Sequence, residues 1–587
     1  MSQTTQAAPM IDSLIGQMTL AEKIGQMTQV EKNSITPAHV TEFAIGSVLS
    51  GGGGNPLNNN PANWAAMVRE FAEAALKTRL RIPLIYGADC VHGHNNMYGA
   101  VVFPHNIGLG ATRDTALVEQ IGYITAREML AANVHWNFAP CLAVPQDVRW
   151  GRTYEGYASD TAIVGELGAA YVRGLQRGGA AACIKHYVGD GGAEWDTHVS
   201  VSWANFWEQN GGQWRIDQGD VNLDEPTFRA IHLAPYLQSL EAGALTVMAS
   251  FSSWRGLKMH AHRYLLTDVL KGELGFSGFI VSDWMGINQL SPDSYTCIVQ
   301  SINAGIDMVM VPYNYEQFIA GLTRAVENRD VKMERVDDAV RRILWVKQQL
   351  GLFDQPLTDP DLLDLVGSNT HRAVARDAVR KSLVLLKNEN AALPITAETK
   401  HLLIAGQGAD DLGLQSGGWT IEWQGVIGDC LPGTSLLKGL RERLGASVRI
   451  DYDVRANFPA DRERAPLGIY VAAEFPYAEG VGDSDTLQLL PADLDGIRKL
   501  REHCDKLVLV LYSGRPLIIT DIAPLCDAIV AAWLPGSEGE GVADVLCGDY
   551  PFSGKLPHPW VSSVDQLPLS KLKTSGEAPL FPYGAGL

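Results

Sequence analysis

Short apolar runs alternate with longer amphipathic stretches from about residue 10 to residue 355. This alternation predicts parallel strands joined by helices, because a strand covered on both faces is apolar throughout, whereas a surface helix is apolar on one side. The number of strand and helix units predicts a (β/α)8-like TIM barrel, with an open doubly wound sheet as the alternative. The expected strands are Ile45–Leu49, Pro83–Gly87, Val134–Ala139, Ala181–His186, Leu245–Ser250, Phe279–Asp283 and Asp307–Val311.

A second α/β pattern follows a segment rich in Pro and Asp, GLFDQPLTDPDLLDLV, which is typical of a linker. It predicts a second domain, an α/β sandwich. Its expected strands are Leu383–Leu386, His401–Ala405, Val448–Tyr452, Leu467–Ala473, Leu507–Tyr512 and Ala528–Ala532. The expected division of the chain is a barrel at 10–355, a linker at 356–378, an α/β sandwich at 379–555 and a C-terminal tail at 556–587 that wraps back over the surface.

Polar residues stand at or near the ends of the expected barrel strands. They are Asp89, Asn137, Lys185, His186, Ser250 and Asp283. In both candidate folds, ligands bind at the carboxyl ends of parallel strands, so the functional site is expected there.

The 587 residues exceed one ordinary core, and 46% are hydrophobic, so the chain can bury two domains. A formal charge of -19 argues against a nucleic-acid partner, because that affinity rests on clustered Lys and Arg. A neutral substrate fits better, although the charge also serves solubility.

No apolar run approaches the roughly 20 residues of a membrane span, and the start MSQTTQAAPM lacks the order of a signal peptide. We expect a soluble chain without a membrane partner, and leave open a periplasmic, secreted or cytoplasmic location. The eight cysteines are scattered singly and are expected to be buried. No convincing metal-ligand spacing is present, so neither a metal nor a cofactor is expected.

A stretch rich in aromatic residues interrupts the first domain among Asn, Gln, Gly and Ser. It contains Trp195, Trp203, Phe206, Trp207 and Trp214. Aromatic faces on polar loops stack against the apolar face of a sugar ring. The alternative is a loop that its own aromatic side chains pin to the core, and the sequence leaves both open.

One expected strand ends in a carboxylate followed by an aromatic residue, in the order Phe-Ile-Val-Ser-Asp283-Trp284. Hydrolysis of a glycoside with retention needs two carboxyl groups about 5 to 5.5 Å apart, and a strand end of a barrel can supply one of them. The alternative role for Asp283 is an N-cap of the next helix.

Several long segments match one family in order along nearly the whole chain. They are YGADCVHGHNN (86–96), FPHNIGLGATRD (103–114), RWGRTYE (149–155), KHYVGDGG (185–192), GFSGFIVSDW (275–284), RKSLVLLKN (380–388), GGWTIEWQG (417–425) and AAWLPGSEGEGVADVL (531–546). The chain resembles the β-glucosidases and β-glucan exohydrolases of glycoside hydrolase family 3. This resemblance implies a retaining, exo-acting enzyme that releases glucose from β-linked gluco-oligosaccharides and aryl β-glucosides through a covalent glycosyl-enzyme, without a cofactor.

The resemblance also implies roles for individual residues. Asp283 matches the nucleophile, and Glu479 in AAEFPYAEGVGD (472–483) matches the acid/base residue, with Glu474 as the competing candidate. The residues that match those gripping the hydroxyls of the terminal glucose in the −1 subsite are Asp89, Arg152, Lys185 and His186. Trp284 and Trp423 match the tryptophans that clamp the +1 sugar, whereas Trp419 is expected to be a core anchor.

Two positions depart from the family pattern. Phe251 stands where the family usually has a tyrosine near the nucleophile, which removes one hydrogen bond to the carboxylate. Gln289 stands where the plant exohydrolases carry a basic residue. Both changes affect the expected fine specificity.

Two alternative functions remain. The order Lys185-His186 followed by Asp196-Thr197-His198 is similar to the N-acetylglucosaminidase branch of the family, in which an Asp-His dyad replaces the glutamate acid. A catalytically silent carbohydrate-binding or sensor protein is the other alternative. The presence of both Asp283 and Glu479 argues against silence, since binding alone does not require that pair.

Overall fold

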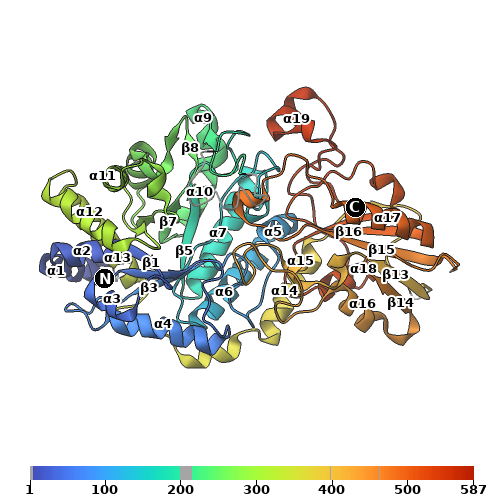
Figure 1. Ribbon diagram of the computed structural model, residues 1–587, viewed down its shortest axis with the longest axis horizontal. Coiled ribbons are helices and arrows are strands. Elements are labelled where there is room, and N and C mark those ends of the chain that lie inside the picture. The colour runs from blue at the N-terminus through green and yellow to red at the C-terminus, as the bar shows by residue number, and fades with distance from the viewer. Residues whose placement is uncertain (1–3, 199–213, 397, 462) are drawn as a thin grey trace.

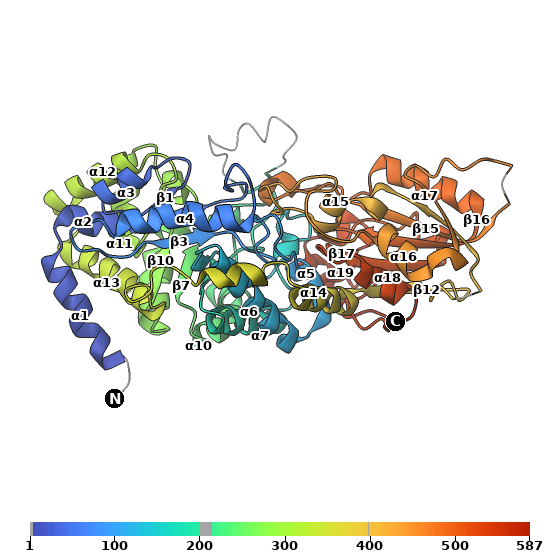
Figure 2. The ribbon, with the colours of Figure 1, turned by 90° about the horizontal axis from the view of Figure 1, so that it is seen from below.

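The computed structural model describes residues 4–198, 214–396, 398–461 and 463–587. Figure 1 shows two bodies along the long axis of the molecule, with the N-terminus in the first and the C-terminus in the second. Figure 2 shows the same division from below, with α14 (Asn369–Ser382) between the barrel helices and the second domain.

The first body is a barrel of parallel strands. In the described part of the chain its eight strands lie in the order β10-β7-β5-β4-β3-β2-β1-β11. They are β1 (Thr28–Glu31), β2 (Ser47–Ser50), β3 (Ile85–Ala88), β4 (Trp136–Asn137), β5 (Ala181–Tyr187), β7 (Thr246–Ala249), β10 (Phe279–Val281) and β11 (Val309–Met310). A bridge between Val281 and Met308 joins the two outer strands and nearly closes the sheet. The predicted TIM barrel is confirmed.

Helices cover the outside of the barrel. The main ones are α1 (Thr4–Gln17), α2 (Leu20–Gln26), α3 (Pro37–Glu42), α4 (Pro61–Ala75), α5 (Asn106–Thr112), α6 (Thr115–Ala131), α7 (Thr161–Arg177), α9 (Glu225–Phe228), α10 (Ala234–Glu241), α11 (Ser294–Ala304), α12 (Tyr315–Glu327) and α13 (Met333–Gln349). Asp114 and Asp160 begin α6 and α7, because each side chain accepts a backbone N–H of the first turn. Between β7 and β10 a π-helix, Tyr264–Glu273, takes the place of the usual helix.

The pattern of apolar runs predicts seven barrel strands and overlooks β1. Its sequence, Thr-Gln-Val-Glu, is mostly polar, although all four residues are buried. Two of the polar side chains find buried partners: Gln29 Nε2 donates to Ser47 Oγ on the neighbouring strand at 2.9 Å, and Thr28 Oγ1 donates to the carbonyl of Ile24 in α2 at 2.8 Å. Hydrogen bonding therefore replaces apolar packing in this strand, which removes the signal used to find it.

The second body is built on a mixed sheet of six strands, counted over its described residues, in the order β12-β17-β16-β15-β13-β14. They are β12 (Val384–Asn388), β13 (His401–Ala405), β14 (Arg449–Asp453), β15 (Ala465–Ala473), β16 (Cys504–Tyr512) and β17 (Ala528–Trp533). Only the pair of β12 and β17 is antiparallel. All six expected strands are present, and the predicted second α/β domain is confirmed.

Alternate residues of this sheet pack into two different apolar clusters. Leu402 and Ile404 belong to one cluster, and Leu403 and Ala405 belong to the other, because successive side chains of a strand point to opposite faces. Helices cover both faces. On one face lies α17 (Pro491–His503), and on the other lie α15 (Leu412–Ser416), α16 (Leu436–Leu444) and α18 (Glu540–Leu546). The last helix, α19 (Leu569–Ser575), packs in a separate apolar cluster.

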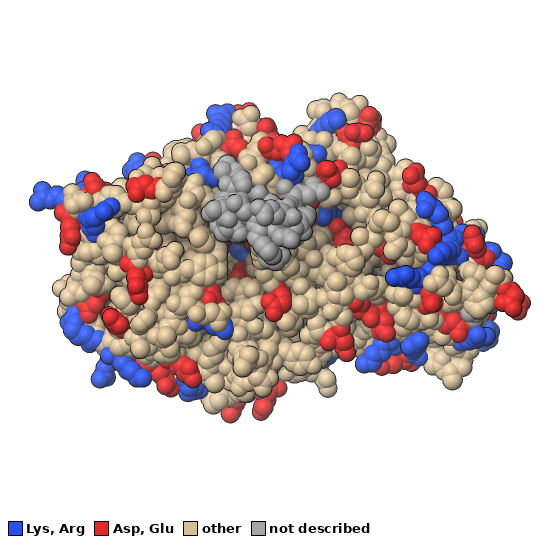
Figure 3. All heavy atoms as spheres, in the orientation of Figure 1, with Lys and Arg blue, Asp and Glu red and all other residues tan. Residues whose placement is uncertain are grey.

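Two segments tie the bodies together. The proposed linker, 356–378, contains the first part of α14, which packs against both α5 and α18. The C-terminal tail returns to the barrel, where the Leu569 N–H donates to the carbonyl of Gln146 at 2.8 Å. Between the bodies, the described surface in Figure 3 is mostly uncharged, and basic and acidic side chains are interspersed elsewhere on that face. None of the described helices combines the length and the apolar character that crossing a membrane requires.

Candidate active site

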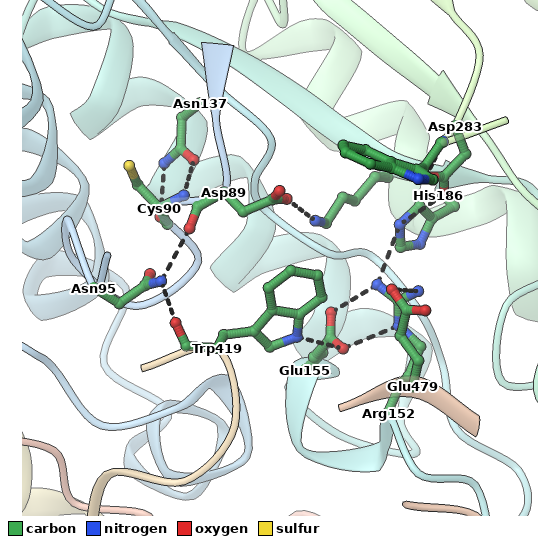
Figure 4. Close-up of polar contacts among 12 residues, drawn as sticks. Asp89, Cys90, Asn95, Asn137, Arg152, Glu155, His186, Asp283, Trp419 and Glu479 are labelled. Carbon is green, nitrogen blue, oxygen red and sulfur yellow. Dashed lines mark hydrogen bonds and ion pairs between the residues drawn. The ribbon is translucent and has the colours of Figure 1, made fainter. Parts of the chain in front are cut away.

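A cavity of about 500 Å³ lies at the carboxyl ends of the barrel strands and is walled on one side by the second domain. All eight site residues expected from the sequence line it. They are Asp89, Arg152, Lys185, His186, Asp283, Trp284, Trp423 and Glu479. Figure 4 shows how most of these side chains converge from different strands and from both domains. The sequence missed other lining residues, among them Glu31 and Tyr313.

Asp283 lies two residues beyond the end of β10, and it is only 8% exposed. Its backbone N–H donates to His260 Nε2 at 3.0 Å, and its Oδ1 accepts the Trp284 N–H at 2.6 Å. Oδ2 accepts no hydrogen bond from any described residue and lies 3.5 Å from His186 Nε2. The carboxylate is thus held at the wall of the cavity, with Oδ2 buried beside His186.

His186 on β5 is oriented by a second buried carboxylate. Its Nδ1 lies 2.5 Å from Asp190 Oδ2, and Asp190 also accepts the hydroxyl of Ser250. Burial alone would raise the pKa of Asp190, but His186 and Arg152 lower it below its ordinary value. An ionised Asp190 therefore holds the ring so that Nε2 faces Asp283. The KHYVGDGG motif contains Asp190, but the role of Asp190 in orienting His186 is seen only from their contact in the structure.

The same region contains one group of side chains that could hold a metal ion. Cys141, His186 and Asp190 place their ligand atoms within 4.8 Å of one another, counting described residues only. His186 and Asp190 are already joined by a hydrogen bond. The arrangement serves the orientation of the imidazole, and no step of the chemistry below requires an ion.

Arg152 connects the barrel to the second domain. It forms a two-point ion pair with Glu155, with distances of 2.9 Å from Nε to Oε1 and 3.0 Å from Nη2 to Oε2. Its Nη1 lies 3.5 Å from Oε1 of Glu479. Burial favours a higher pKa for Glu155, yet the charges of Arg152 and Lys185 lower it below the ordinary value. Glu155, in the RWGRTYE motif, was not singled out from the sequence.

Glu155 also receives a hydrogen bond from the second domain, since Trp419 Nε1 donates to its Oε1 at 3.1 Å. Trp419, expected as a core anchor, is 5% exposed and packs in the core of the second domain. It also lines the cavity, where its ring lies 5.5 Å from Lys185 Nζ. It therefore combines a packing role with a place in the wall of the site.

Asp89 follows β3 and pairs with Lys185, at 3.3 Å between Oδ1 and Nζ. Burial raises the pKa of Asp89, against the opposing charge of Lys185. Its backbone carbonyl accepts Asn95 Nδ2 at 3.0 Å, and the same amide donates to the carbonyl of Trp419 at 2.7 Å. Figure 4 shows this path from the Asp89 loop into the second domain.

Glu479 begins a short 3₁₀ helix, Glu479–Gly482, on the loop after β15. Burial raises its pKa to about 7, Arg152 opposes this shift, and the charge of Asp283 adds to it. Glu474, the competing candidate, has a different environment. It accepts hydrogen bonds from Tyr477 Oη at 3.0 Å and from the Gly514 N–H at 2.9 Å, and it does not line the cavity.

Aromatic side chains form the outer walls of the cavity. Trp284 contacts Tyr313 edge to face, with ring centroids 5.7 Å apart. A loop of four glycines, Gly51–Gly54, lies between β2 and α4 and approaches the backbone of Trp423. A Cβ atom on Gly52 would lie 2.6 Å from the Cα of Trp423, so a larger residue cannot occupy this position without displacing that wall.

Of the two departures from the family pattern, one lines the cavity and the other does not. Phe251 lines the cavity and contributes no hydroxyl group. Gln289 is part-buried, and its Nε2 donates to Gln218 Oε1 at 2.9 Å. A pair of neutral amides thus occupies the position at which a basic residue was expected from the plant exohydrolases.

The alternative Asp196-Thr197-His198 dyad lies outside the cavity lining. Asp196 is half exposed and pairs with Arg215. Of the aromatic stretch, Trp195 stacks against Arg149 at 4.2 Å and Trp214 is buried against Trp423. Trp203, Phe206 and Trp207 lie outside the described residues. The described ends of the stretch are therefore pinned by packing.

Comparisons with known proteins agree with this architecture. Residues 19–346 match the Glycosyl hydrolase family 3 N terminal domain, and residues 383–587 match the C-terminal domain of the same family. A lysosomal beta glucosidase of Dictyostelium discoideum is 32% identical over 98% of this chain and 75% of its own length. A periplasmic beta-glucosidase of Salmonella typhimurium is 28% identical over 98% of this chain and 80% of its own length.

Solved structures give the same result. An exo-1,3/1,4-beta-glucanase from a Pseudoalteromonas species superposes with a TM-score of 0.90 at 38% identity, over 99% of this chain and 95% of that one. A beta-glucosidase from Listeria innocua in complex with glucose has a TM-score of 0.84 at 26% identity, over 100% and 83% of the two chains. This chain therefore belongs to glycosyl hydrolase family 3 and is a glycoside hydrolase.

Proposed function

We propose that this protein is a retaining, exo-acting β-glucosidase or glucan glucohydrolase. It releases glucose from the non-reducing ends of β-linked gluco-oligosaccharides and also cleaves aryl β-glucosides. The observation that carries the proposal is the pair of carboxyl groups that line one cavity from two domains: Asp283 with an unbonded oxygen, and Glu479 with a pKa raised to about 7.

In the first step, the Asp283 carboxylate attacks the anomeric carbon and forms an ester bond to the sugar. The bond from that carbon to the leaving oxygen breaks, and Glu479 gives its proton to this oxygen. In the second step, the ionised Glu479 takes a proton from water, whose oxygen attacks the same carbon while Asp283 leaves as a carboxylate. Two inversions at one carbon retain the β configuration.

The raised pKa of Glu479 suits both steps. Burial and the neighbouring Asp283 carboxylate favour the protonated form in the free enzyme, with Arg152 opposing them. Esterification of Asp283 removes its negative charge, so the pKa of Glu479 falls and the group can act as a base. The same residue can therefore serve as acid and then as base.

The inner end of the cavity presents donors and acceptors to a sugar ring. Asp89 supplies a carboxylate, while Lys185 and Arg152 supply cationic N–H groups, and all three are held by partners in the structure. A sugar hydroxyl both donates and accepts hydrogen bonds, so such a set can satisfy it completely. An analogue that lacks the hydroxyl would leave buried groups unpaired, which provides discrimination.

Trp284 and Trp423 are proposed to hold the +1 sugar by stacking, which does not specify which hydroxyl carries the bond. The enzyme is therefore expected to accept more than one β-linkage. The name of the Pseudoalteromonas relative, an exo-1,3/1,4-beta-glucanase, supports this proposal, as does the Listeria beta-glucosidase solved with laminaribiose.

The test uses a panel of aryl β-glycosides together with cellobiose and laminaribiose, with NMR detection of the first anomer released. Glucosides should be preferred over N-acetylglucosaminides, and β-glucose should appear before α-glucose. First release of α-glucose would exclude retention. A preference for N-acetylglucosaminides would favour the dyad mechanism, and an absence of hydrolysis across the panel would favour a silent binding protein.

A further inference from the structure

The Asp483 carboxylate, four residues after Glu479, is tied to the barrel by backbone groups. It is 3% exposed, and all of its backbone donors in the described chain belong to the barrel domain. Oδ1 accepts the Gly151 N–H at 2.8 Å. Oδ2 accepts the N–H groups of Arg215, Ile216 and Asp217, at 2.8, 2.9 and 2.9 Å. Charge-assisted hydrogen bonds of this kind are stronger than neutral ones.

The loop between Glu479 and Asp483 is also packed closely from the barrel side. The backbone N–H of Trp214 donates to the carbonyl of Gly480 at 3.0 Å. A Cβ atom on Gly480 would lie 2.3 Å from the indole of Trp214, so the ring rests directly on the backbone next to Glu479. The Asp483 N–H closes the turn by donating to the Gly480 carbonyl at 3.2 Å.

These contacts determine where the second domain presents its acid. Among the described residues, the Glu479 carboxyl group is joined to the barrel by one ion pair, with Arg152 at 3.5 Å, which is longer than a hydrogen bond. That contact alone is too loose to fix a carboxyl group on another domain. Three of the four bonds to Asp483 fasten the loop to the segment 215–217, which directly follows the aromatic stretch, and the fourth fastens it to Gly151. Small displacements of a catalytic group, of about 1 Å, can cost about 10²-fold in rate.

We propose that Asp483 is a positioning residue, which holds the Glu479 carboxyl group over the cavity by fastening its loop to Gly151 and to the 215–217 segment of the barrel. This inference rests on the proposed role of Glu479 as the acid/base residue. Asp483 itself touches no substrate. Its loss should therefore affect the steps that need proton transfer, and should spare binding of the glucosyl group.

The experiment compares Asp483→Ala and Asp483→Asn with an exposed control on the same loop, Thr486→Ala. For each variant, kcat and KM are measured on cellobiose, whose leaving group needs an acid, and the rate of glycosyl-enzyme formation is measured on 2,4-dinitrophenyl β-glucoside, whose leaving group does not. Asp483→Ala should lower kcat on cellobiose about 10²-fold and change the activated substrate less than tenfold. Asp483→Asn keeps one acceptor oxygen and should recover part of the loss.

Thr486→Ala should behave as the wild type. Equal losses of Asp483→Ala on both substrates, or no loss on either, would overturn the proposal. If Asp483→Ala does not fold, as judged by circular dichroism and thermal melting, the same comparison is made with Asp483→Asn, for which an equal loss on both substrates again overturns it. Glu479→Ala, measured in parallel, distinguishes a failure of the acid/base assignment from a failure of the positioning role. If Glu479→Ala loses the same activity on cellobiose and on the activated substrate, both the acid/base assignment and the positioning role fail. If Glu479→Ala loses more on cellobiose but the Asp483 variants do not, only the positioning role fails.

Discussion

Nη1 of Arg152 in the barrel lies 3.5 Å from Oε1 of Glu479 in the second domain. The site is therefore complete only where the two domains meet. Arg152 also binds Glu155 at two points, so its guanidinium is fixed before it faces Glu479. Because its positive charge opposes the effect of burial, it contributes to setting the pKa of Glu479 to about 7. The predictions below test what this arrangement can do.

Glu479→Ala should nearly abolish cleavage of cellobiose and laminaribiose, since their leaving groups need a proton. Formation of the glycosyl-enzyme from 2,4-dinitrophenyl β-glucoside should survive, because that leaving group departs largely unaided. Azide should restore turnover and give β-glucosyl azide, since a small anion needs no general base. Steady-state kinetics with product identification by NMR measure both effects.

The matched control is His198→Ala, which should change activity little because the Asp196-Thr197-His198 segment does not line the cavity. Azide rescue in His198→Ala but not in Glu479→Ala would contradict the assignment of the acid. In that case N-acetylglucosaminides should also be the better substrates.

The raised pKa of Glu479 predicts the pH dependence of the reaction. Because the pKa of Glu479 in the free enzyme is about 7, its protonated form is lost as the pH rises through that value. The value of kcat/KM for cellobiose should therefore fall above a pH of about 7, whereas the glycosylation rate with 2,4-dinitrophenyl β-glucoside should fall much less. Identical basic limbs for the two substrates would show that another group titrates.

The same shift predicts an effect on stability. A carboxyl group whose pKa is higher in the folded state stabilises the fold below its unfolded value near 4.5, and this contribution is lost as the pH rises through about 7. Glu479→Gln, which cannot ionise, should therefore raise the melting temperature relative to the wild type at pH 8, by a few degrees, and by less at pH 5. A rise in melting temperature that is the same at both pH values would indicate that altered packing, rather than ionisation of Glu479, causes it.

Asp283→Asn should reduce turnover by about 10⁴-fold or more and leave the fold intact, because the substitution is nearly isosteric and removes the nucleophilic charge. Binding of glucose, followed by calorimetry, should persist. Residual activity within tenfold of the wild type, in a preparation free of deamidated protein, would refute the role of Asp283.

Trp423→Ala should weaken binding of disaccharides by about 1 to 3 kcal/mol, the range of aromatic stacking contributions. Aryl glucosides with small leaving groups should be affected less, because they do not fill the +1 position. The measurement is KM and kcat/KM for both classes of substrate. Trp423 also packs against Trp214, so an equal loss on all substrates would indicate that the loss of this packing dominates.

Apolar runs along the chain were sufficient to locate most of the fold. Seven of the eight barrel strands and all six strands of the second sheet appear where continuous apolar segments predict them. The exception, Thr28–Glu31, is buried through hydrogen bonds rather than apolar packing, so its polar sequence carries no strand signal. Periodicity reports apolar residues that avoid water, and it does not detect polar residues that are buried in a barrel.

The sequence by itself determined the residue types of the site and their order along the chain, because strand ends and matched motifs are local features. It could not determine the partnerships. Asp190 orients His186, Glu155 holds Arg152, and Glu474 bonds within its own domain while Glu479 faces Asp283. The longest of these relationships, between Asp283 and Glu479, joins positions about 200 residues apart in different domains. Burial and electrostatic effects depend on such through-space contacts, so only the tertiary structure decided which carboxyl groups are held ionised and which one is kept ready to donate a proton.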